Sequence, residues 1–263
     1  MVERRRQIGM AIAIGLACGG AGTAARAQND EGPAVVPYRP SVATPADLPA
    51  PGWPELESGV NWGKGGDTAR SLSSPVTFKL AWDESWGVLI GTDLYDWQRA
   101  FDGTSAHSGG DTSLMLKYKL PVNENLALGL EIGPILPTAR PPIGSGGAET
   151  EINTIASFDY AGVHVDVNVA GTHLRAVDAG QGAWQGLWAI AASHSLDDQV
   201  GVTGELSGVA QHGTSAQAQG LVALNYNVSR ALVLDVATAA GLSRSAPKWQ
   251  LMTGMTVRLG HWF

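Results

Sequence analysis

Hydrophobic and polar residues alternate along much of this chain with a period of two. In the segment 163–169, which reads VHVDVNV, every valine falls on one face of an extended strand and every polar residue on the other. The segments 114–120 and 126–132 show the same alternation. From residue 55 onward, about a dozen such segments of roughly 9 to 14 residues follow one another, which is the length of tilted transmembrane strands. We predict strands near 55–63, 74–82, 86–97, 109–121, 126–137, 149–160, 163–174, 182–195, 200–211, 215–227, 231–243 and 247–263.

The connections between these segments alternate in length. Short turns are expected at 83–85, 123–125, 161–162, 197–199 and 228–230, and longer loops rich in Gly, Ser or Pro lie between them. Short periplasmic turns and long outer loops are typical of an up-and-down barrel. We therefore predict an all-β fold, a closed antiparallel transmembrane β-barrel of about 12 strands, because an even count keeps both ends of the barrel in the periplasm.

Aromatic residues favour a membrane barrel over a soluble β-sandwich, which would alternate as well. They collect at strand ends, where an amphipathic ring can sit at the lipid headgroups. One predicted girdle, beside the short turns, contains Trp82, Trp86, Tyr118, Tyr160, Tyr226 and Phe263, and the other, toward the long loops, contains Trp62, Trp97, Trp184 and Trp249. Outer-membrane lipid is thus an expected partner.

The end of the chain resembles the terminal signal of outer-membrane barrels. Val257, Leu259, His261 and Phe263 share one face of the last predicted strand, and the final residue is aromatic. We expect the barrel-assembly machinery to be a partner through this C-terminal strand ending in Phe263.

The first 27 residues read as a cleavable signal peptide. Arg4, Arg5 and Arg6 form a basic region, 8–16 is an apolar core, and Ala25-Arg26-Ala27 is a small-x-small cleavage site. The apolar core is too short and too rich in Gly and Ala for a retained anchor. Cys18 is a weaker match to a lipoprotein cleavage site. No later segment has 18 consecutive apolar residues, so we predict export to the outer membrane of a Gram-negative bacterium and no transmembrane helix.

Charge and cysteine content narrow the possible functions. Cleavage after Ala27 removes the single Cys and leaves 13 basic and 23 acidic residues, a net charge of −10. Neither a disulfide nor a cysteine-ligated metal is therefore expected. The acidic balance argues against a nucleic-acid partner. We predict no cofactor.

Residues 28–54 contain seven of the 14 prolines. Proline donates no ladder hydrogen bond, so this segment cannot be the interior of a sheet. We predict an extended periplasmic leader of polyproline character, with a plain linker favoured over a docking motif. The expected organisation is a signal peptide at 1–27, this leader at 28–54 and the barrel at 55–263.

Short turns fix the register of neighbouring strands and so predict pairs inside the barrel. A turn centred on Glu124 places Lys117 opposite Glu131. The turn at 161–162 places Asp159 opposite His164, and Ser157 opposite Asp166. The predicted lumen-lining, solute-binding residues are Asp93, Lys117, Glu131, Asp159, His164, Asp166, Glu205, Asp235 and Arg258.

Two interpretations of these lumen charges stay open. They can line a polar passage that selects a solute, or they can pair with one another and fill a narrow barrel. A 12-stranded barrel lies between the filled eight-stranded barrels and the open porins.

The histidines do not predict catalysis. In His107-Ser108 and His194-Ser195 the two residues are adjacent and fall on opposite faces of a strand, and His212 and Ser215 have no orienting third group. His164, Asp159 and Asp166 are possible metal-ligand types, but a hydrogen-bonded lumen histidine is the favoured interpretation. We therefore expect no catalytic residues, no metal and no enzymatic activity.

Several segments together resemble a known family. They are 163–171, 204–206, 232–235, 241–242, 246–249, Gly254 and Arg258. They are similar to the outer-membrane barrels named after phenol meta-pathway degradation, also described as transporter-like, over roughly residues 70–263. The ending His261-Trp262-Phe263 departs from the Arg-x-aromatic ending of that family.

The resemblance implies uptake of aromatic or other small hydrophobic compounds. We expect a barrel for passive passage of small solutes. The alternatives are a non-conducting structural or surface-interaction barrel and, less favoured, a lipid-modifying enzyme.

Overall fold

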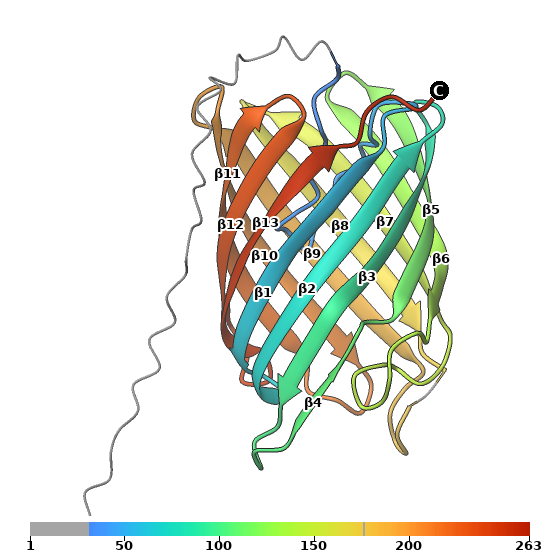
Figure 1. Ribbon diagram of the computed structural model, residues 1–263, viewed down its shortest axis with the longest axis vertical. Helices are drawn as coiled ribbons and strands as arrows, with labels where there is room; N and C mark the ends of the chain where they lie inside the picture. Colours follow the sequence, from blue (N-terminus) through green and yellow to red (C-terminus); the bar gives the residue numbers. More distant parts are fainter. Residues whose placement is uncertain (1–31, 176) are drawn as a thin grey trace, which may run out of the picture. The chain divides into compact units, whose positions relative to one another are not determined.

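The alternation along the chain produces a single antiparallel sheet that closes on itself (Figure 1). The structure is a computed structural model that describes residues 32–175 and 177–263; the predicted signal peptide, residues 1–27, lies outside the described residues. Its strands are β1 (Glu55–Gly65), β2 (Thr68–Ala81), β3 (Trp86–Arg99), β4 (Ser105–Ser108), β5 (Thr112–Asn123), β6 (Leu126–Leu136), β7 (Glu149–Tyr160), β8 (Val163–His173), β9 (Trp184–Ser195), β10 (Val200–Gln211), β11 (Gln217–Ser229), β12 (Leu232–Gly241) and β13 (Pro247–Arg258).

Twelve of these strands form the wall of the barrel. Each pairs with its neighbour in the chain, except that β3 pairs with β5, and β1 closes the ring by pairing with β13. The four-residue strand β4 pairs only with the end of β3 and extends one loop. The closed, antiparallel, 12-stranded barrel predicted from the sequence is confirmed.

The two ends of the barrel differ. The connections from β2 to β3, β5 to β6, β7 to β8, β9 to β10 and β11 to β12 lie at one end, which we call the turn end (Figure 1). The opposite end, which we call the loop end, carries the longer loops and the two-residue connection from β1 to β2. At the turn end, Asp83, Asn123 and Asp197 each accept a hydrogen bond at Oδ1 from the amide two residues ahead, at 2.7 to 2.9 Å. These Asx turns explain why the chain reverses where the sequence predicted.

The C-terminal residues depart from the prediction. Strand β13 ends at Arg258, so the expected strand up to Phe263 is wrong. Gly260 has φ 99°, which breaks the extended backbone. The amides of Leu259 and Trp262 donate to the carbonyls of Pro54 and Gly52, at 2.9 and 2.8 Å, instead of continuing the sheet. The role of Phe263 in assembly stays a prediction.

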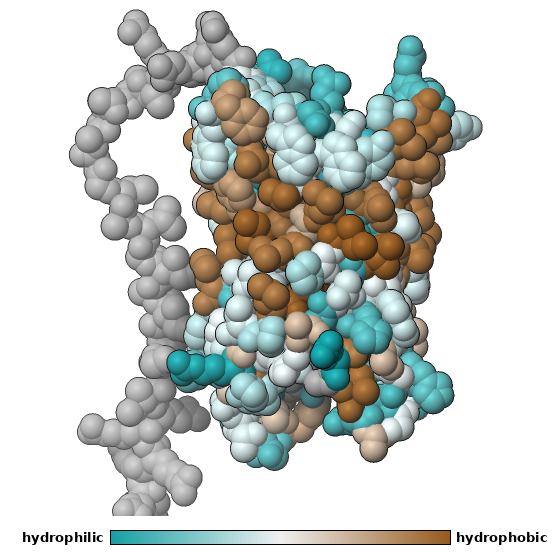
Figure 2. Space-filling model, turned by 90° about the vertical axis from the view of Figure 1, so that its right-hand side faces the viewer, coloured by the Kyte–Doolittle hydropathy of each residue, from teal (hydrophilic) through white to brown (hydrophobic). Residues whose placement is uncertain are grey.

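The outer face of the wall is apolar. On β8, Val169 is 59% exposed whereas Asn168 beside it is 1% exposed, so the valines point outward and the polar residues inward. Figure 2 shows a hydrophobic belt across the outer wall with paler and more hydrophilic residues on both sides. Among residues 32–175 and 177–263, no helix is long and apolar enough to cross a membrane.

The predicted aromatic girdles flank this belt. At the turn end, the rings of Trp86 and Tyr118 lie 4.6 Å apart. Toward the loop end, the rings of Trp62 and Trp249 lie 5.1 Å apart. Tyr160 and Trp184 are also exposed, at 77% and 60%. Such rings mark the two boundaries of a membrane.

The interior of the barrel is mostly polar, with small apolar patches. Its most deeply buried large side chains belong to Glu55, Lys79, Lys117, Asn168 and Thr256. One apolar patch joins Leu221 and Met252 to three alanines on β11 and β12. Residues 32–54 were expected to extend away from the barrel. Instead they enter it from the turn end and lie against this polar wall, because they bring main-chain donors to its carboxylates (Figure 1).

Reversing the polarity of one lipid-facing position tests this assignment of faces. Val167 pairs with Ile190 on the outer surface. We expect Val167→Arg to lower the free energy of unfolding by about 2–4 kcal/mol if it lies near the bilayer midplane. The control is His173→Arg on the same face beside Trp184, where about 0–1 kcal/mol is expected near the interface. Urea unfolding in lipid vesicles measures both, and equal losses would show that the apolar belt is misplaced.

Candidate functional site

A segment of the chain crosses the lumen near the turn end. We call residues 33–48 the plug. Val35, Tyr38, Ala43, Ala46 and Leu48 of the plug are all at most 8% exposed. The segment belongs to the same compact unit as the strands. Any path through the barrel therefore has to pass the plug.

The wall binds the plug mainly through the backbone of the plug. Side chains of the wall accept hydrogen bonds from five plug amides: Val36 to Glu55 at 3.0 Å, Tyr38 to Glu57 at 2.7 Å, Val42 and Ala43 to Glu205 at 2.7 and 3.0 Å, and Ala46 to Ser157 at 2.7 Å. Two lysines of the wall donate hydrogen bonds to plug carbonyls: Lys79 to the carbonyl of Val36 and Lys117 to the carbonyl of Pro45. Hydrogen bonds that involve a charged partner are about twice as strong as neutral ones.

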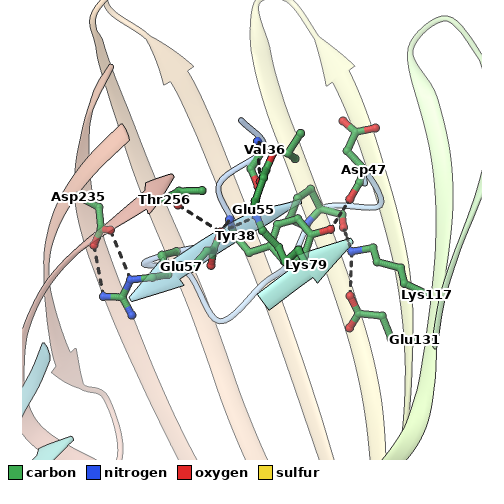
Figure 3. A network of polar contacts seen from close by, with 12 residues as sticks. Val36, Tyr38, Asp47, Glu55, Glu57, Lys79, Lys117, Glu131, Asp235 and Thr256 are labelled. Carbon is green, nitrogen blue, oxygen red and sulfur yellow. Dashed lines mark hydrogen bonds and ion pairs between the residues drawn. The ribbon is translucent and has the colours of Figure 1, made fainter. Parts of the chain in front are cut away.

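Tyr38 has the largest buried side chain of the plug (Figure 3). The ammonium nitrogens of Lys79 and Lys117 lie 4.0 and 4.2 Å from the centre of its ring. These distances suit cation–π attraction. Its hydroxyl donates to the carbonyl of Asp47 at 2.6 Å. Burial, and then the charges of Glu131 and Glu57, raise the pKa of Tyr38 well above its usual range, so the phenol keeps its proton.

The two lysines that enclose Tyr38 are paired with wall carboxylates. Lys79 lies 2.8 Å from Glu55 and 2.7 Å from Glu57. Lys117 lies 2.8 Å from Glu131, which also accepts from Asn153 at 3.0 Å. A further ion pair joins Arg39 of the plug to Asp235 at 3.4 Å. The contacts in Figure 3 thus form one polar network across the lumen.

The register predicted from the turns is confirmed. Lys117 faces Glu131 across β5 and β6, and the pairs Asp159–His164 and Ser157–Asp166 face each other across β7 and β8. Of the predicted lumen residues, Lys117, Glu131, Glu205, Asp235 and Arg258 contact the plug. A binding role for them stays a prediction.

Asp159, His164 and Asp166 form a separate group at the turn end. His164 contacts Asp159 through Nδ1 at 2.9 Å and Asp166 through Nε2 at 3.2 Å. Both ring nitrogens of His164 thus contact carboxylates, so neither is available to Ser193, which lies opposite His164 in the register of β8 and β9. Within the described parts of the chain, no group of three or more His, Cys, Asp or Glu residues is placed to hold a metal ion.

Arg258 and Asp93 lie toward opposite ends of the barrel. Arg258 stacks over Trp53 at 4.7 Å and donates to the carbonyl of Pro33 near the turn end. Asp93 lies toward the loop end and lines a cavity there.

Sequence reasoning missed four charged residues of the network, Arg39, Glu55, Glu57 and Lys79. The alternation gave a usable signal for three of them, because Glu55 and Glu57 flank Leu56 and Lys79 lies between Phe78 and Leu80. Nothing in the leader indicated that Arg39 and Tyr38 turn toward the wall.

Cavities lie on both sides of the plug. The loop-side cavity, about 490 Å³, is bounded by Tyr38 and Arg39 of the plug and by strands that run toward the loop end. At the turn end, two cavities of about 350 and 430 Å³ touch Pro37 of the plug. The plug is thus one chain segment between spaces that lie toward opposite ends of the barrel.

Comparison with known proteins identifies the class of fold. No family model matches the chain, and no curated protein matches it in sequence. An outer-membrane channel from Pseudomonas putida F1 has a similar structure, with TM-score 0.65, 12% identity, and coverage of 81% of this chain and 98% of that one. The NanC porin has TM-score 0.59, 7% identity and coverage of 78% and 100%. The KdgM porin has TM-score 0.54, 11% identity and coverage of 78% and 99%.

At these identities the likeness shows the fold. Together with the hydrophobic belt and the aromatic girdles, it makes this chain a transmembrane β-barrel of the outer-membrane type. The resemblance to the phenol meta-pathway family stays a prediction.

The buried pair Lys117–Glu131 should be energetically coupled. Lys117→Met leaves the Glu131 carboxylate uncompensated, so we expect a loss of about 3–5 kcal/mol in the free energy of unfolding. The double variant Lys117→Met, Glu131→Gln should lose less than the sum of the single variants, by about 0.5–3 kcal/mol.

The control is the more exposed pair Lys119–Asp47, whose side chains are 26% and 43% exposed. Its double-mutant cycle should show about 0–1 kcal/mol of coupling. Both cycles are measured by urea unfolding in detergent. Additive losses for Lys117 and Glu131 would contradict the buried pair.

Proposed function

We propose that this protein lets small solutes pass passively across the outer membrane through its lumen, and that the plug limits the passage. The observation that carries this proposal is the pair of cavity systems, one toward each end of the barrel, with a single chain segment between them. Displacing that one segment would join them into a path.

The way the plug is attached supports reversible displacement. Hydrogen bonds and ion pairs join the plug to the wall, and water can replace such contacts when the plug leaves. The wall exposed in that state carries Glu55, Glu57, Lys79 and Glu205, which hydrate readily. A plug held by a large apolar interface would instead expose hydrophobic surface to water.

The similar folds of the P. putida channel and the two porins agree with this proposal. Export through the predicted signal peptide, orientation with the turn end in the periplasm, and uptake as the direction of transport complete it. The lumen also contains apolar side chains, including Leu89 and Met115, so a solute with a compact apolar part can be accommodated.

A second candidate is a non-conducting structural barrel. The dense network around Tyr38 favours it, because every charge of that network has a partner. The two candidates differ in one measurable property, which is the effect of the plug on permeability.

Liposome swelling with small sugars, acids and amines tests this directly. We expect the wild-type protein to permit swelling, and Tyr38→Ala with Glu205→Ala to accelerate it, because these changes remove the enclosed ring and the acceptor of two plug amides. For the opposite effect, Ala43 packs in one buried cluster with Ala189 and Ala191. Ala43→Cys paired with Ala189→Cys or Ala191→Cys, in a Cys18→Ser background, should tether the plug by a disulfide.

The oxidised tether should stop swelling, and reduction of the same sample should restore it. Ala191→Cys alone is the matched control and should not respond to oxidation. Absence of swelling in the wild-type protein, or equal swelling with and without the tether, would overturn the proposal in favour of a structural barrel.

A further inference from the structure

The loop-side cavity has an unbalanced charge. Three cations of the neighbouring network are already committed to carboxylates: Lys79 to Glu55 and Glu57, Lys117 to Glu131, and Arg39 to Asp235. Asp111 is also satisfied, because it accepts hydrogen bonds from the amides of Ala139 and Ser145 at 2.9 and 2.8 Å. The cavity's other two carboxylates, Asp93 and Glu151, require separate consideration.

Asp93 and Glu151 have no cationic partner among the residues that the structure describes. The Oδ1 atom of Asp93 is buried and has no hydrogen-bond partner there. Glu151 accepts one hydrogen bond, from Thr172 at 3.2 Å. Two carboxylates without a cationic partner make the cavity lining negative, so this cavity favours a ligand that brings positive charge.

The apolar part of the cavity lining favours an organic cation over a metal ion. Tyr38, Leu89 and Met115 form one buried apolar cluster with Ile135 against it, and all four residues line the cavity. A metal ion would require several oxygen ligands around one point, which the described residues do not provide. A volume of about 490 Å³ is in the range of small-molecule sites. An apolar surface in a cavity that also carries two unpaired carboxylates fits an amine with a compact hydrocarbon body.

We propose that the loop-side cavity binds a small organic monocation, an ammonium group on a compact apolar body, with the unpaired carboxylates Asp93 and Glu151 supplying the negative charge that attracts the ammonium and the Tyr38–Leu89–Met115 cluster receiving the hydrocarbon. This inference rests on the proposed function, since it names the class of solute that the lumen takes. Cavities lined by charge of one sign within low-dielectric walls concentrate the opposite ion.

Calorimetric titration of the purified full-length barrel in detergent tests this site with three matched probes. We expect saturable binding of butylammonium and no binding of butanol or butanoate. Asp93→Asn and Glu151→Gln should each weaken butylammonium binding by about tenfold, because each removes one negative charge from the cavity lining. The control is Asp102→Asn, which makes the same charge change in an exposed loop outside the cavity and should leave binding unchanged.

The slower migration of boiled samples on a detergent gel checks that each variant is folded, and Glu151→Gln carries the test if Asp93→Asn does not fold. No binding of butylammonium, equal binding of butanoate, or an equal loss with Asp102→Asn would overturn the inference.

Binding in detergent does not require passage through the barrel. Binding without liposome swelling would therefore overturn the proposed function and leave the site, whereas swelling without ammonium binding would overturn the site alone.

Discussion

An extended chain buried inside a barrel must find a partner for every peptide N–H and C=O group that it brings out of water. The plug meets this constraint with the side chains of the wall, because it joins no β-ladder. Glu205 alone accepts from two successive amides, those of Val42 and Ala43. Conversely, the wall could not carry so many buried carboxylates without these donors. Plug and wall therefore compensate each other's polar groups, and neither is tolerable in a dry lumen alone.

Proline reduces the number of donors that need compensation. The plug contains Pro33, Pro37, Pro40 and Pro45, none of which has a peptide N–H. Pro33, Pro37 and Pro45 also restrict the backbone to extended conformations, whereas Arg39 and Pro40 form a turn. This path lets the remaining amides reach different strands around the wall. The composition that excludes this segment from a sheet is thus the composition that suits it to a buried, unpaired path. The same residues would serve equally in a solvated linker, which is why composition alone cannot distinguish the two.

The alternating pattern was sufficient to predict the wall of the barrel but not the plug inside it. A period of two assigns Val167 to lipid and Asp166 to the lumen, and a short turn then fixes the opposite residue, as it did for Lys117 and Glu131. The plug has no period, and its contacts span large separations in sequence, as between Val42 and Glu205, 163 residues apart. The end of β13 was missed for a related reason. The alternation of residues between the two faces continued through Phe263 in the sequence. The strand nevertheless ends before it, because Gly260 has a positive φ and the amides of Leu259 and Trp262 donate to the carbonyls of Pro54 and Gly52.

The charge that the plug carries links its position to the kind of solute that the lumen favours. Its two ionic contacts with the wall are Arg39 with Asp235 and Asp47 with Lys119. The first pair is buried and the second is partly exposed to water, so they do not contribute equally to the field inside the barrel. Withdrawal of the plug removes the guanidinium from Asp235 and the amide donors from Glu205, leaving both carboxylates to face the open lumen. In the proposed open state, Asp235 and Glu205 would add negative charge to the lumen, with Lys119 offsetting part of it near the turn end. A cation drawn toward Asp93 and Glu151 would then meet attraction at these two carboxylates, and an anion would meet repulsion there.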